Sequence, residues 1–302
     1  MLSARFTADG SFSLHSHRFA ESFHSSAGAL EESRLKFVRP AQLERFSYAP
    51  CLRVLDVCFG LGYNTAALMS ALPDRGGPIL NCWALELDRT PLALALAEPK
   101  FKALWPEHVV ASLGALSAQG CWHDVRRRQS VQMLWGDARQ QLKNLPKDVS
   151  IDLILLDAFS PGKCPQLWSE EFLKRLAGLL APGGRLLTYC RAAAVRNSLR
   201  NAGLELRSLF PMAGEGAGWS SGTLALKPSG NHQALPETGP GWCGLSVMEE
   251  EHLLTRAGVP YRDPFGTDAA NVILARRQQE QLSVDCPSTS AWQRKWRIGA
   301  QS

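Results

Sequence analysis

The chain has 302 residues, a hydrophobic fraction of 45% that includes nine Trp and twelve Phe, and a formal net charge of +5. This length and composition suit one large α/β domain with appendages, or two small domains, and they are ample for a packed core. The apolar runs fall short of the roughly 18–20 residues that span a bilayer. The N-terminus also lacks the apolar segment of a secretory signal, so we expect a cytoplasmic protein with no membrane partner.

The eight cysteines and seven histidines are scattered along the sequence. No C-x-x-C pair and no H-x-x-x-H spacing occurs. His15 and His17 alternate, but no further side chain with ligand spacing joins them. We expect reduced, mostly buried thiols and no metal site.

Positive charge is concentrated in a few places. Arg126–Arg128 form one run, Arg276 and Arg277 another, and the tail reads "WQRKWR" at 292–297. Basic side chains interleaved with aromatic ones suit phosphates and stacked bases, although a solvated surface accounts equally well for any single run. Together the runs favour a polyanionic partner.

Residues 1–49 are polar and weakly periodic, and we assign them to an N-terminal extension. From residue 50 onward strands and helices alternate, which predicts a parallel sheet. The strands are expected at 53–58, 79–87, 131–135, 151–157 and 185–190. Helices are expected from Asn64 to the residue before Pro73, at 91–97 and at 193–202, and an elaborated connection at 99–130.

The stretch "SEEFLKRLAGLL" at 169–180 predicts a further helix. Ser169 is a suitable N-cap, and Glu170 and Glu171 favour the positive helix start. Apolar residues at helical spacing form one stripe. "APGG" at 181–184 is expected to end this helix, because Pro182 cannot continue it and Gly183 is free to turn.

Two apolar runs, 204–210 and 219–226, surround a "GEGAG" turn and predict a closing antiparallel hairpin. The expected sheet is therefore seven-stranded and mostly parallel, with an antiparallel last strand. Residues 50–228 form the core on this division. Residues 229–302 form a C-terminal linker and helical extension.

A glycine turn follows the first strand, in "VLDVCFGLGYN" at 54–64. Gly60 and Gly62 would let backbone N–H groups approach a ligand at a helix N-terminus. By itself such a turn is compatible with a dinucleotide, with S-adenosylmethionine or with no ligand. Thr65 stands where a dinucleotide fingerprint has its third glycine, which counts against NAD and FAD.

The next three strands each end in an acid. Glu86 is placed to accept ribose hydroxyls. Asp137 is placed to meet an adenine amino group while the Ala138 N–H meets a ring nitrogen, and Asp157 ends the fourth strand. Each acid alone could be a helix cap or a solvated residue. The ordered set resembles the core of class I, S-adenosylmethionine-dependent methyltransferases, a Rossmann-like fold, and that resemblance implies the cofactor.

A narrower resemblance lies in the loop "DAFSPGKCPQLWSEEF" at 157–172. This loop, residues 23–43 and "AAAVRNSLRNAGLEL" at 192–206 resemble the methyltransferase half of the MnmC family of bifunctional tRNA-modifying enzymes. The resemblance covers roughly residues 12–210. No flavin fingerprint is found, as in stand-alone members of that family. The resemblance implies N-methylation of the aminomethyl group of wobble uridine (U34), with the tRNA anticodon region as partner.

The same resemblance implies roles for single residues. It implies that the catalytic carboxyl group is that of Asp157, which lies beside the transferred methyl and also contacts the cofactor. The resemblance further makes Asp56 and Asn64 cofactor residues. Phe159, Lys163 and Trp168 are implied to shape the nucleoside pocket, and the N-terminal extension, residues 1–49, is implied to contribute to the substrate and cofactor site.

The chain departs from this family at two places. Cys58 replaces a glycine, so we expect an ordinary φ there, and "GAGWSSG" at 216–222 replaces the family's closing motif. Two other functions stay open. One is a spermidine-synthase-type aminopropyltransferase, for which a second acid soon after Asp157 is missing. The other is a non-catalytic methyltransferase-like fold that binds RNA.

Overall fold

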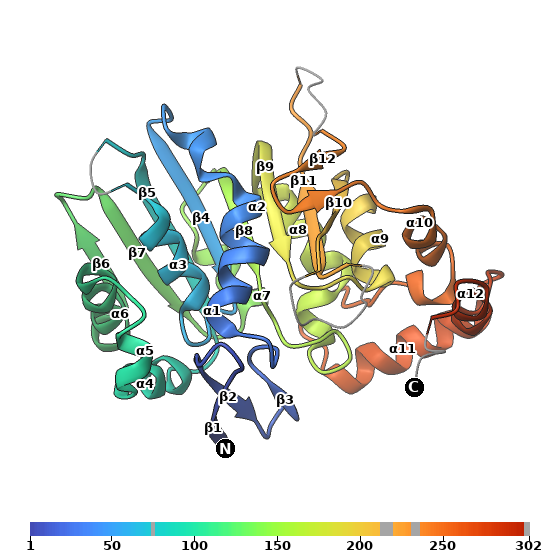
Figure 1. Ribbon diagram of the computed structural model, residues 1–302. Coiled ribbons are helices and arrows are strands. Elements are labelled where there is room, and N and C mark those ends of the chain that lie inside the picture. The colour runs from blue at the N-terminus through green and yellow to red at the C-terminus, as the bar shows by residue number, and fades with distance from the viewer. Residues whose placement is uncertain (74–75, 212–219, 231–235, 299–302) are drawn as a thin grey trace.

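The computed structural model describes residues 1–73, 76–211, 220–230 and 236–298. A ten-stranded sheet forms its centre, in the order β12-β13-β10-β11-β9-β8-β4-β5-β7-β6, and helices cover both of its faces (Figure 1). The five central strands run parallel: β4 (Cys51–Val57), β5 (Ile79–Glu86), β7 (Gln129–Trp135), β8 (Ile151–Leu156) and β9 (Leu180–Thr188).

The expected seven-stranded core is present within this larger sheet, as β7-β5-β4-β8-β9-β11-β10. β11 (Gly222–Leu226) runs antiparallel to both β9 and β10 (Glu205–Leu209) and so confirms the antiparallel closing strand. The expected "GEGAG" turn lies outside the described residues. The count of seven is too low, because short strands extend both edges: β6 (Cys121–Asp124), β12 (Thr238–Gly239) and β13 (Trp242–Cys243).

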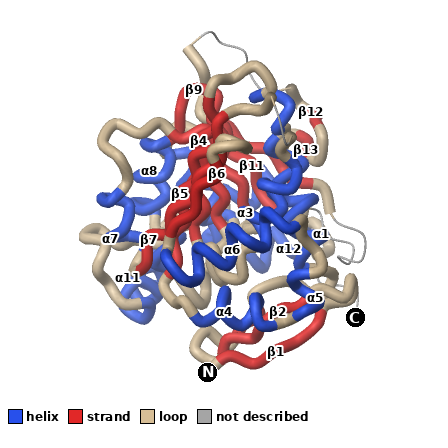
Figure 2. The backbone as a smooth tube through the Cα atoms, turned by 90° about the vertical axis from the view of Figure 1, so that its left-hand side faces the viewer, coloured by secondary structure: helices blue, strands red, loops and turns tan. Residues whose placement is uncertain are grey.

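Two hydrophobic cores lie on the two faces of the sheet. Along β4, Leu52 and Val54 face one core while Leu55 and Val57 face the other, as the period of two in a strand requires. Burial on both faces explains why the central strands are almost continuously apolar. Figure 2 shows the strands between the two helical layers.

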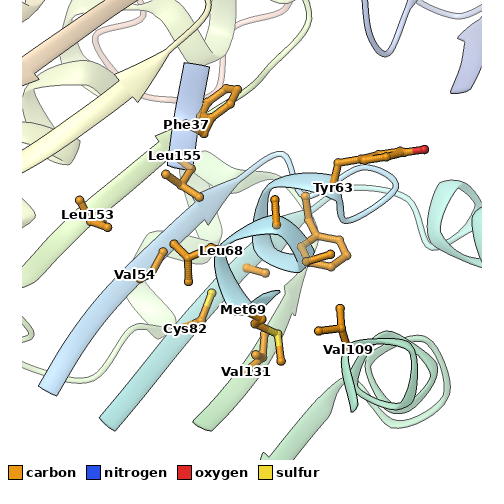
Figure 3. Close-up of a cluster of buried hydrophobic side chains, with 14 of the residues drawn as sticks. Phe37, Val54, Tyr63, Leu68, Met69, Cys82, Val109, Val131, Leu153 and Leu155 are labelled. Atoms are coloured by element: carbon orange, nitrogen blue, oxygen red, sulfur yellow. The ribbon is translucent and has the colours of Figure 1, made fainter. Parts of the chain in front are cut away.

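The first core lies under α3 (Tyr63–Ala71) and α6 (Glu107–Gln119). Figure 3 shows part of it, with Leu68 and Met69 of α3 packed over Val54, Cys82 and Val131 of the strands. The helices α4 (Thr90–Ala97) and α5 (Pro99–Lys102) complete this face.

The second core lies under α8 (Glu170–Leu179) and α9 (Ala193–Asn201). Ser169 accepts a hydrogen bond from the Phe172 N–H at 3.3 Å, which confirms it as the N-cap of α8. The other helices of this side are α7 (Ala138–Gln141), α10 (Val247–Leu253), α11 (Ala270–Ser283) and α12 (Thr289–Lys295). Within the described ranges, no helix is long and apolar enough to cross a membrane.

The N-terminal extension is more ordered than its polar sequence suggested. It forms a separate antiparallel sheet of β1 (Leu2–Phe6), β2 (Phe12–Ser16) and β3 (Glu21–Ser22). The chain then continues through the helix α1 (Ala29–Glu32), the π-helix η1 (Ser33–Val38) and the helix α2 (Arg39–Ala41). These three helices lie against α3 and β9. Figure 1 shows β1–β3 at the lower end of the molecule.

The helix expected at 169–180 ends within one residue of its expected end, but "APGG" does not form a separate turn and the expected start of the following strand at 185 is too late. α8 ends at Leu179, and "APGG" lies within β9, whose pairing with β8 shifts from Ile151↔Leu180 to Leu153↔Arg185. Gly183 has a φ of +75°, and its N–H bonds to the Lys227 carbonyl at 2.8 Å. The segment is therefore a bulge in the strand.

The expected ordinary φ at Cys58 is also wrong, because the structure gives it a φ of +70°. The N–H groups of Cys58 and Phe59 both donate to the Leu85 carbonyl at 3.0 Å, so the chain leaves the sheet in an abrupt turn. A side chain in the left-handed region is strained by roughly 1–2 kcal/mol. The strain lies directly before the glycine turn, at the edge of the candidate site.

We predict that Cys58→Gly is more stable than Cys58→Ala by about 1 kcal/mol, because glycine adopts this φ without strain. Free energies of unfolding from urea titrations measure the difference. The matched pair Cys121→Gly and Cys121→Ala, in strand β6 at ordinary φ, should show the opposite order. The same order at both positions would contradict the strain at Cys58.

Candidate active site

The central strands end level with one another. Val57 of β4 pairs with Leu85 of β5 and Leu156 of β8, and Glu86 pairs with Trp135 of β7. The chain winds outward from β4 to β5 and β7 on one side and through β8 to β9 on the other. Parallel α/β sheets bind ligands at the carboxyl ends beside such a reversal. A cavity of about 1010 Å³ lies there.

The glycine turn forms one side of this cavity. Gly60, at a φ of +56°, donates its N–H to Glu86 Oε2 at 2.7 Å. Glu86 Oε1 accepts the N–H groups of Leu87 and Asp88 at 2.7 and 3.0 Å. Burial raises the pKa of Glu86, and these backbone N–H groups partly offset the rise. Gly60 and Glu86 both line the cavity.

Gly62 has a different place from Gly60. It is the N-cap residue of α3 with a φ of +92°, and a Cβ there would lie 2.9 Å from the Phe59 ring. It is absent from the described cavity lining. Its glycine identity is therefore explained by helix packing and backbone conformation.

Asp137 is held in a fixed orientation by Arg139. The acid caps α7 by accepting the Arg139 N–H at 2.9 Å, and its two oxygens accept the guanidinium Nη2 at 2.7 Å and Nε at 3.1 Å. Arg139 Nη1 in turn donates to Asp263 Oδ2 at 2.6 Å, and the Asp263 side chain is completely buried. Asp137, Ala138 and Arg139 all line the cavity, so the plane of the carboxylate is fixed where it faces a ligand.

Asp157 lies at the inner part of the cavity wall. Its Oδ2 accepts a hydrogen bond from Asn64 Nδ2 at 2.8 Å, so Asn64, which is absent from the described lining, acts on the cavity through Asp157. Burial, and next the charge of Glu32, raise the pKa of Asp157 to about 8, while Lys36 lowers it.

Glu32 and Lys36 form a buried ion pair of 2.9 Å on the N-terminal extension, and both line the cavity. They are four residues apart in "ESRLK", and Lys36 belongs to the π-helix η1. Such helices are rare and are frequent at functional sites. The pair places one buried positive charge close to Asp157.

Asp56 lies behind the cavity rather than in it. It is completely buried in β4, and its Oδ2 accepts the Thr65 hydroxyl at 2.6 Å. Burial raises its pKa to about 7. Because Thr65 is on α3, this contact fastens the helix to the strand beneath the glycine turn.

Aromatic rings form another part of the cavity wall, which meets the glycine turn where Phe23 lies beside Gly60. Phe159 stacks on Phe19 with ring centroids 4.4 Å apart, and Phe23 meets Phe159 edge-on at 5.0 Å. All three rings line the cavity. Glu21 holds this loop against the N-terminal sheet by accepting the Ser160 N–H at 3.1 Å and its hydroxyl at 2.7 Å.

Two of the residues expected to shape the nucleoside pocket lie elsewhere. Trp168 is completely buried and donates its indole N–H to the Phe159 carbonyl at 2.7 Å. It therefore supports the aromatic wall from behind. Lys163 is exposed on the loop surface and is absent from the described cavity lining.

Sequence reasoning missed several residues of this site. Arg139 and Asp263 are 124 positions apart, and nothing local pairs them. Glu21, Glu32 and Lys36 belong to a segment that looked like a polar extension. The i, i+4 spacing of Glu32 and Lys36 was a usable signal, and the aromatic residues Phe19 and Phe23 were another.

The donor set fits a nucleoside. Glu86 offers carboxylate oxygens for hydroxyl groups, and Asp137 with the Ala138 N–H offers an acceptor and a donor to a base edge. Gly60 allows a close approach, since a Cβ there would already lie 3.3 Å from the Phe23 ring. In the part of the chain that is described, no three His, Cys, Asp or Glu side chains are grouped to hold a metal ion.

Comparison with known proteins agrees with this geometry. Residues 100–216 match a family described as S-adenosyl-L-methionine-dependent methyltransferase. The chain is 31% identical over 232 residues to the tRNA 5-methylaminomethyl-2-thiouridine biosynthesis bifunctional protein MnmC of Chromobacterium violaceum, covering 72% of this chain and 34% of that protein. To the protein of the same name from Azoarcus it is 32% identical, covering 88% and 44%.

Among solved structures, MnmC2 from Aquifex aeolicus superposes with a TM-score of 0.75 at 26% identity. The match covers 94% of this chain and 86% of that one. By contrast, the chain spans between a third and a half of the length of the two bifunctional relatives.

We predict that Asp263→Asn lowers the free energy of unfolding by about 2–3 kcal/mol, because it weakens the hydrogen bonds of a buried charged group. The matched control is Glu250→Gln, which breaks the exposed Arg200–Glu250 pair of 2.8 Å. That loss should stay below about 1 kcal/mol. Equal losses in urea titrations would contradict the structural role of Asp263.

We also predict that Asp157 contributes a loss of stability as pH rises. The folded-state pKa of Asp157, about 8, lies above its ordinary value of 3.8, so the folded protein keeps a proton that the unfolded chain has lost. The contribution of Asp157 to the free energy of unfolding should therefore decrease between about pH 4 and pH 8. His24 and His252, whose pKa values burial lowers to about 4, contribute in the opposite direction below pH 6.5.

Asp157→Asn should reduce that decrease, since asparagine does not titrate and still accepts from Asn64. Urea titrations at several pH values measure the effect. The exposed Asp285→Asn serves as control and should leave the pH profile unchanged. An unchanged profile in Asp157→Asn as well would exclude Asp157 as the titrating group.

Proposed function

The chain belongs to the MnmC-like family of S-adenosyl-L-methionine-dependent methyltransferases, and on that premise we propose that it methylates the aminomethyl nitrogen of wobble uridine (U34) in tRNA. The observation that carries the proposal is the composition of the cavity at the carboxyl ends of the strands. Nucleoside-binding groups from β5 and β7 line one part, and stacked aromatic rings line another. Asp157, at the end of β8, belongs to the same wall.

The cofactor would occupy the part of the cavity beside β5 and β7. Glu86 would accept its ribose hydroxyls, and Asp137 with the Ala138 N–H would hold its adenine. When bound, S-adenosyl-L-methionine supplies an electrophilic methyl group on a sulfonium. Arg139 and Asp263 keep Asp137 in one orientation. The Asp137 side chain therefore loses little further conformational entropy when the cofactor binds.

The substrate base would stack in the aromatic part of the cavity. A wobble base must leave its neighbours in the anticodon loop, and a flipped base is held by aromatic or apolar side chains. Phe19, Phe23 and Phe159 offer such a surface. Trp168 keeps Phe159 in place through its carbonyl.

Asp157 would act on the aminomethyl nitrogen. An amine is nucleophilic once it is neutral, so the main contribution required is alignment and exclusion of water. The carboxylate of Asp157 would accept a hydrogen bond from the nitrogen and stabilise the positive charge that develops on it. Asn64 orients the carboxylate.

The family proteins named above are described as acting in tRNA 5-methylaminomethyl-2-thiouridine biosynthesis, which supports the choice of substrate. Aminopropyl transfer to a polyamine is the competing function. Its second acid is missing from the residues after Asp157, but the N-terminal extension brings Glu21 and Glu32 to the cavity. Both acids already have partners, Ser160 for Glu21 and Lys36 for Glu32, which favours methyl transfer.

The test is transfer of labelled methyl groups to bulk tRNA from cells that lack this modification, followed by nucleoside mass spectrometry. The proposal requires the label in 5-methylaminomethyl uridine or its 2-thio form. A parallel reaction with decarboxylated cofactor and a diamine tests the competing function. Label in any other nucleoside, or product only in the parallel reaction, would overturn the proposed substrate.

We further predict that Asp157→Ala lowers kcat for methyl transfer by at least about 100-fold, since it removes the group that aligns the amine. The dissociation constant of S-adenosylhomocysteine, measured by calorimetry, should change by less than about fivefold. Asp152→Asn, at the opposite end of β8 and paired with Arg53, is the control and should keep kcat. Wild-type turnover in Asp157→Ala would remove Asp157 from the mechanism.

A further inference from the structure

Two exposed arginines line the cavity, and a third directly precedes a lining residue, all from distant parts of the chain. Arg18 lies between β2 and β3, and Arg191 lies between β9 and α9; both are exposed and line the cavity. Arg297 follows α12, is exposed, and directly precedes Ile298, which also lines the cavity. We call Arg18, Arg191 and Arg297 the basic rim.

Local contacts hold two members of the basic rim in place. The guanidinium of Arg18 lies 5.3 Å from the centroid of the Phe19 ring, which itself stacks on Phe159. Arg191 donates from Nη1 to the Ser220 carbonyl at 2.6 Å. Both arginines are thus positioned beside the substrate part of the cavity.

The third member is held by an anchored tail. Trp292 is buried, donates its indole N–H to the Met248 carbonyl at 2.9 Å and stacks on His252. Trp296 donates to Glu251 at 2.9 Å, and Lys295 pairs with the same carboxylate. The aromatic residues of "WQRKWR" therefore serve packing, and they anchor the segment in which Arg297 directly precedes the cavity-lining Ile298.

Side chains of both signs line this cavity: Arg139 lies beside Asp137, and Asp157 follows β8 on the side of β9. Glu86 and Asp137 follow β5 and β7, whereas Arg191 follows β9, and the strand order puts β9 on the other side of β4. The carboxylates of Glu86 and Asp137 suit hydroxyl and amino groups of a nucleoside. The basic rim adjoins the aromatic wall through Arg18 and Phe19, where a substrate base would stack.

We propose that the basic rim binds the phosphates on both sides of the nucleotide whose base enters the cavity. The inference rests on the proposed function, since it names RNA as the polymer. When a base swings out of a strand into a cavity, its neighbouring phosphates stay at the mouth. Arginine matches a phosphate with two parallel hydrogen bonds, and three arginines from three segments could follow a curved backbone such as that of an anticodon loop.

The experiment measures binding of tRNA to the full chain as a function of salt concentration. Each phosphate contact adds about 0.7–0.9 to the slope of log K against log salt. The triple variant Arg18→Ala/Arg191→Ala/Arg297→Ala should therefore show a slope smaller by about two to three and weaken binding at least tenfold. The single variant Arg297→Ala should reduce the slope by about one.

The matched control is Arg126→Ala. Arg126 is an equally exposed arginine beside β6, and Figure 1 shows β6 and α12 at opposite sides of the molecule. This variant should keep the wild-type slope. Thermal melts check that each variant is folded. If the triple variant unfolds, the salt slope of the single variant Arg297→Ala tests the proposal.

The outcomes separate this inference from the proposed function. If wild-type protein methylates tRNA but the variants show the wild-type slope of log K against log salt, the basic rim is excluded and the proposed function is supported. If this slope is smaller in the variants but wild-type protein transfers no methyl group, the basic rim is supported and the proposed function is contradicted. If wild-type protein does not bind tRNA at all, the rim proposal is overturned.

Discussion

The level ends of the parallel strands are the constraint on which this site depends. β4 pairs with β5 and with β8 so that Val57, Leu85 and Leu156 lie side by side. This register brings Gly60, Glu86 and Asp157, which the sequence separates by up to 97 positions, to one edge. A slip of one residue would turn each buried side chain to the other face of the sheet. Both faces carry a hydrophobic core, so the fit of each side chain in its close-packed core, rather than the apolar pattern alone, fixes the register. The same packing that stabilises the sheet therefore positions the carboxylates.

Much of this arrangement was predictable, because its causes are local in the chain. Continuous apolar runs ending in Glu86, Asp137 and Asp157 indicate buried strands whose ends carry function. The partners of these acids were not predictable. Arg139 meets Asp263 only because the loop before α11 packs beside α7. Cys58 adopts a left-handed φ only because two successive N–H groups share the Leu85 carbonyl.

The N-terminal extension shows a second limit of sequence reasoning. Its strand β2 reads "FSLHS" and is largely buried although three of its five residues are polar. The polar side chains are satisfied by neighbours, as in the contact of 2.9 Å between Ser13 and His24, and Tyr63 of α3 donates to the Phe12 carbonyl at 2.9 Å. Polarity therefore did not mean exposure here. The extension instead covers the cavity, and through Glu21, Glu32 and Lys36 it supplies charge that the methyltransferase core itself lacks at that position.

The balance of charge at the inner end of the cavity has a consequence for catalysis. Glu32, Glu86 and Asp157 line this region, Asp56 lies behind it, and Lys36 is the buried base beside them. Burial and mutual repulsion raise the pKa of Asp56 and Asp157 into the neutral range, so the folded chain holds these carboxyls at a cost in free energy.

A cationic group bound nearby would offset that cost and favour their ionised forms. The reaction proposed here has a positive charge that begins on sulfur and ends on nitrogen, so the field of these carboxylates would act on it throughout. Since the carboxylates are fixed by Asn64, Thr65 and backbone N–H groups, the field needs no reorganisation during transfer, which is the condition under which electrostatic stabilisation is most effective.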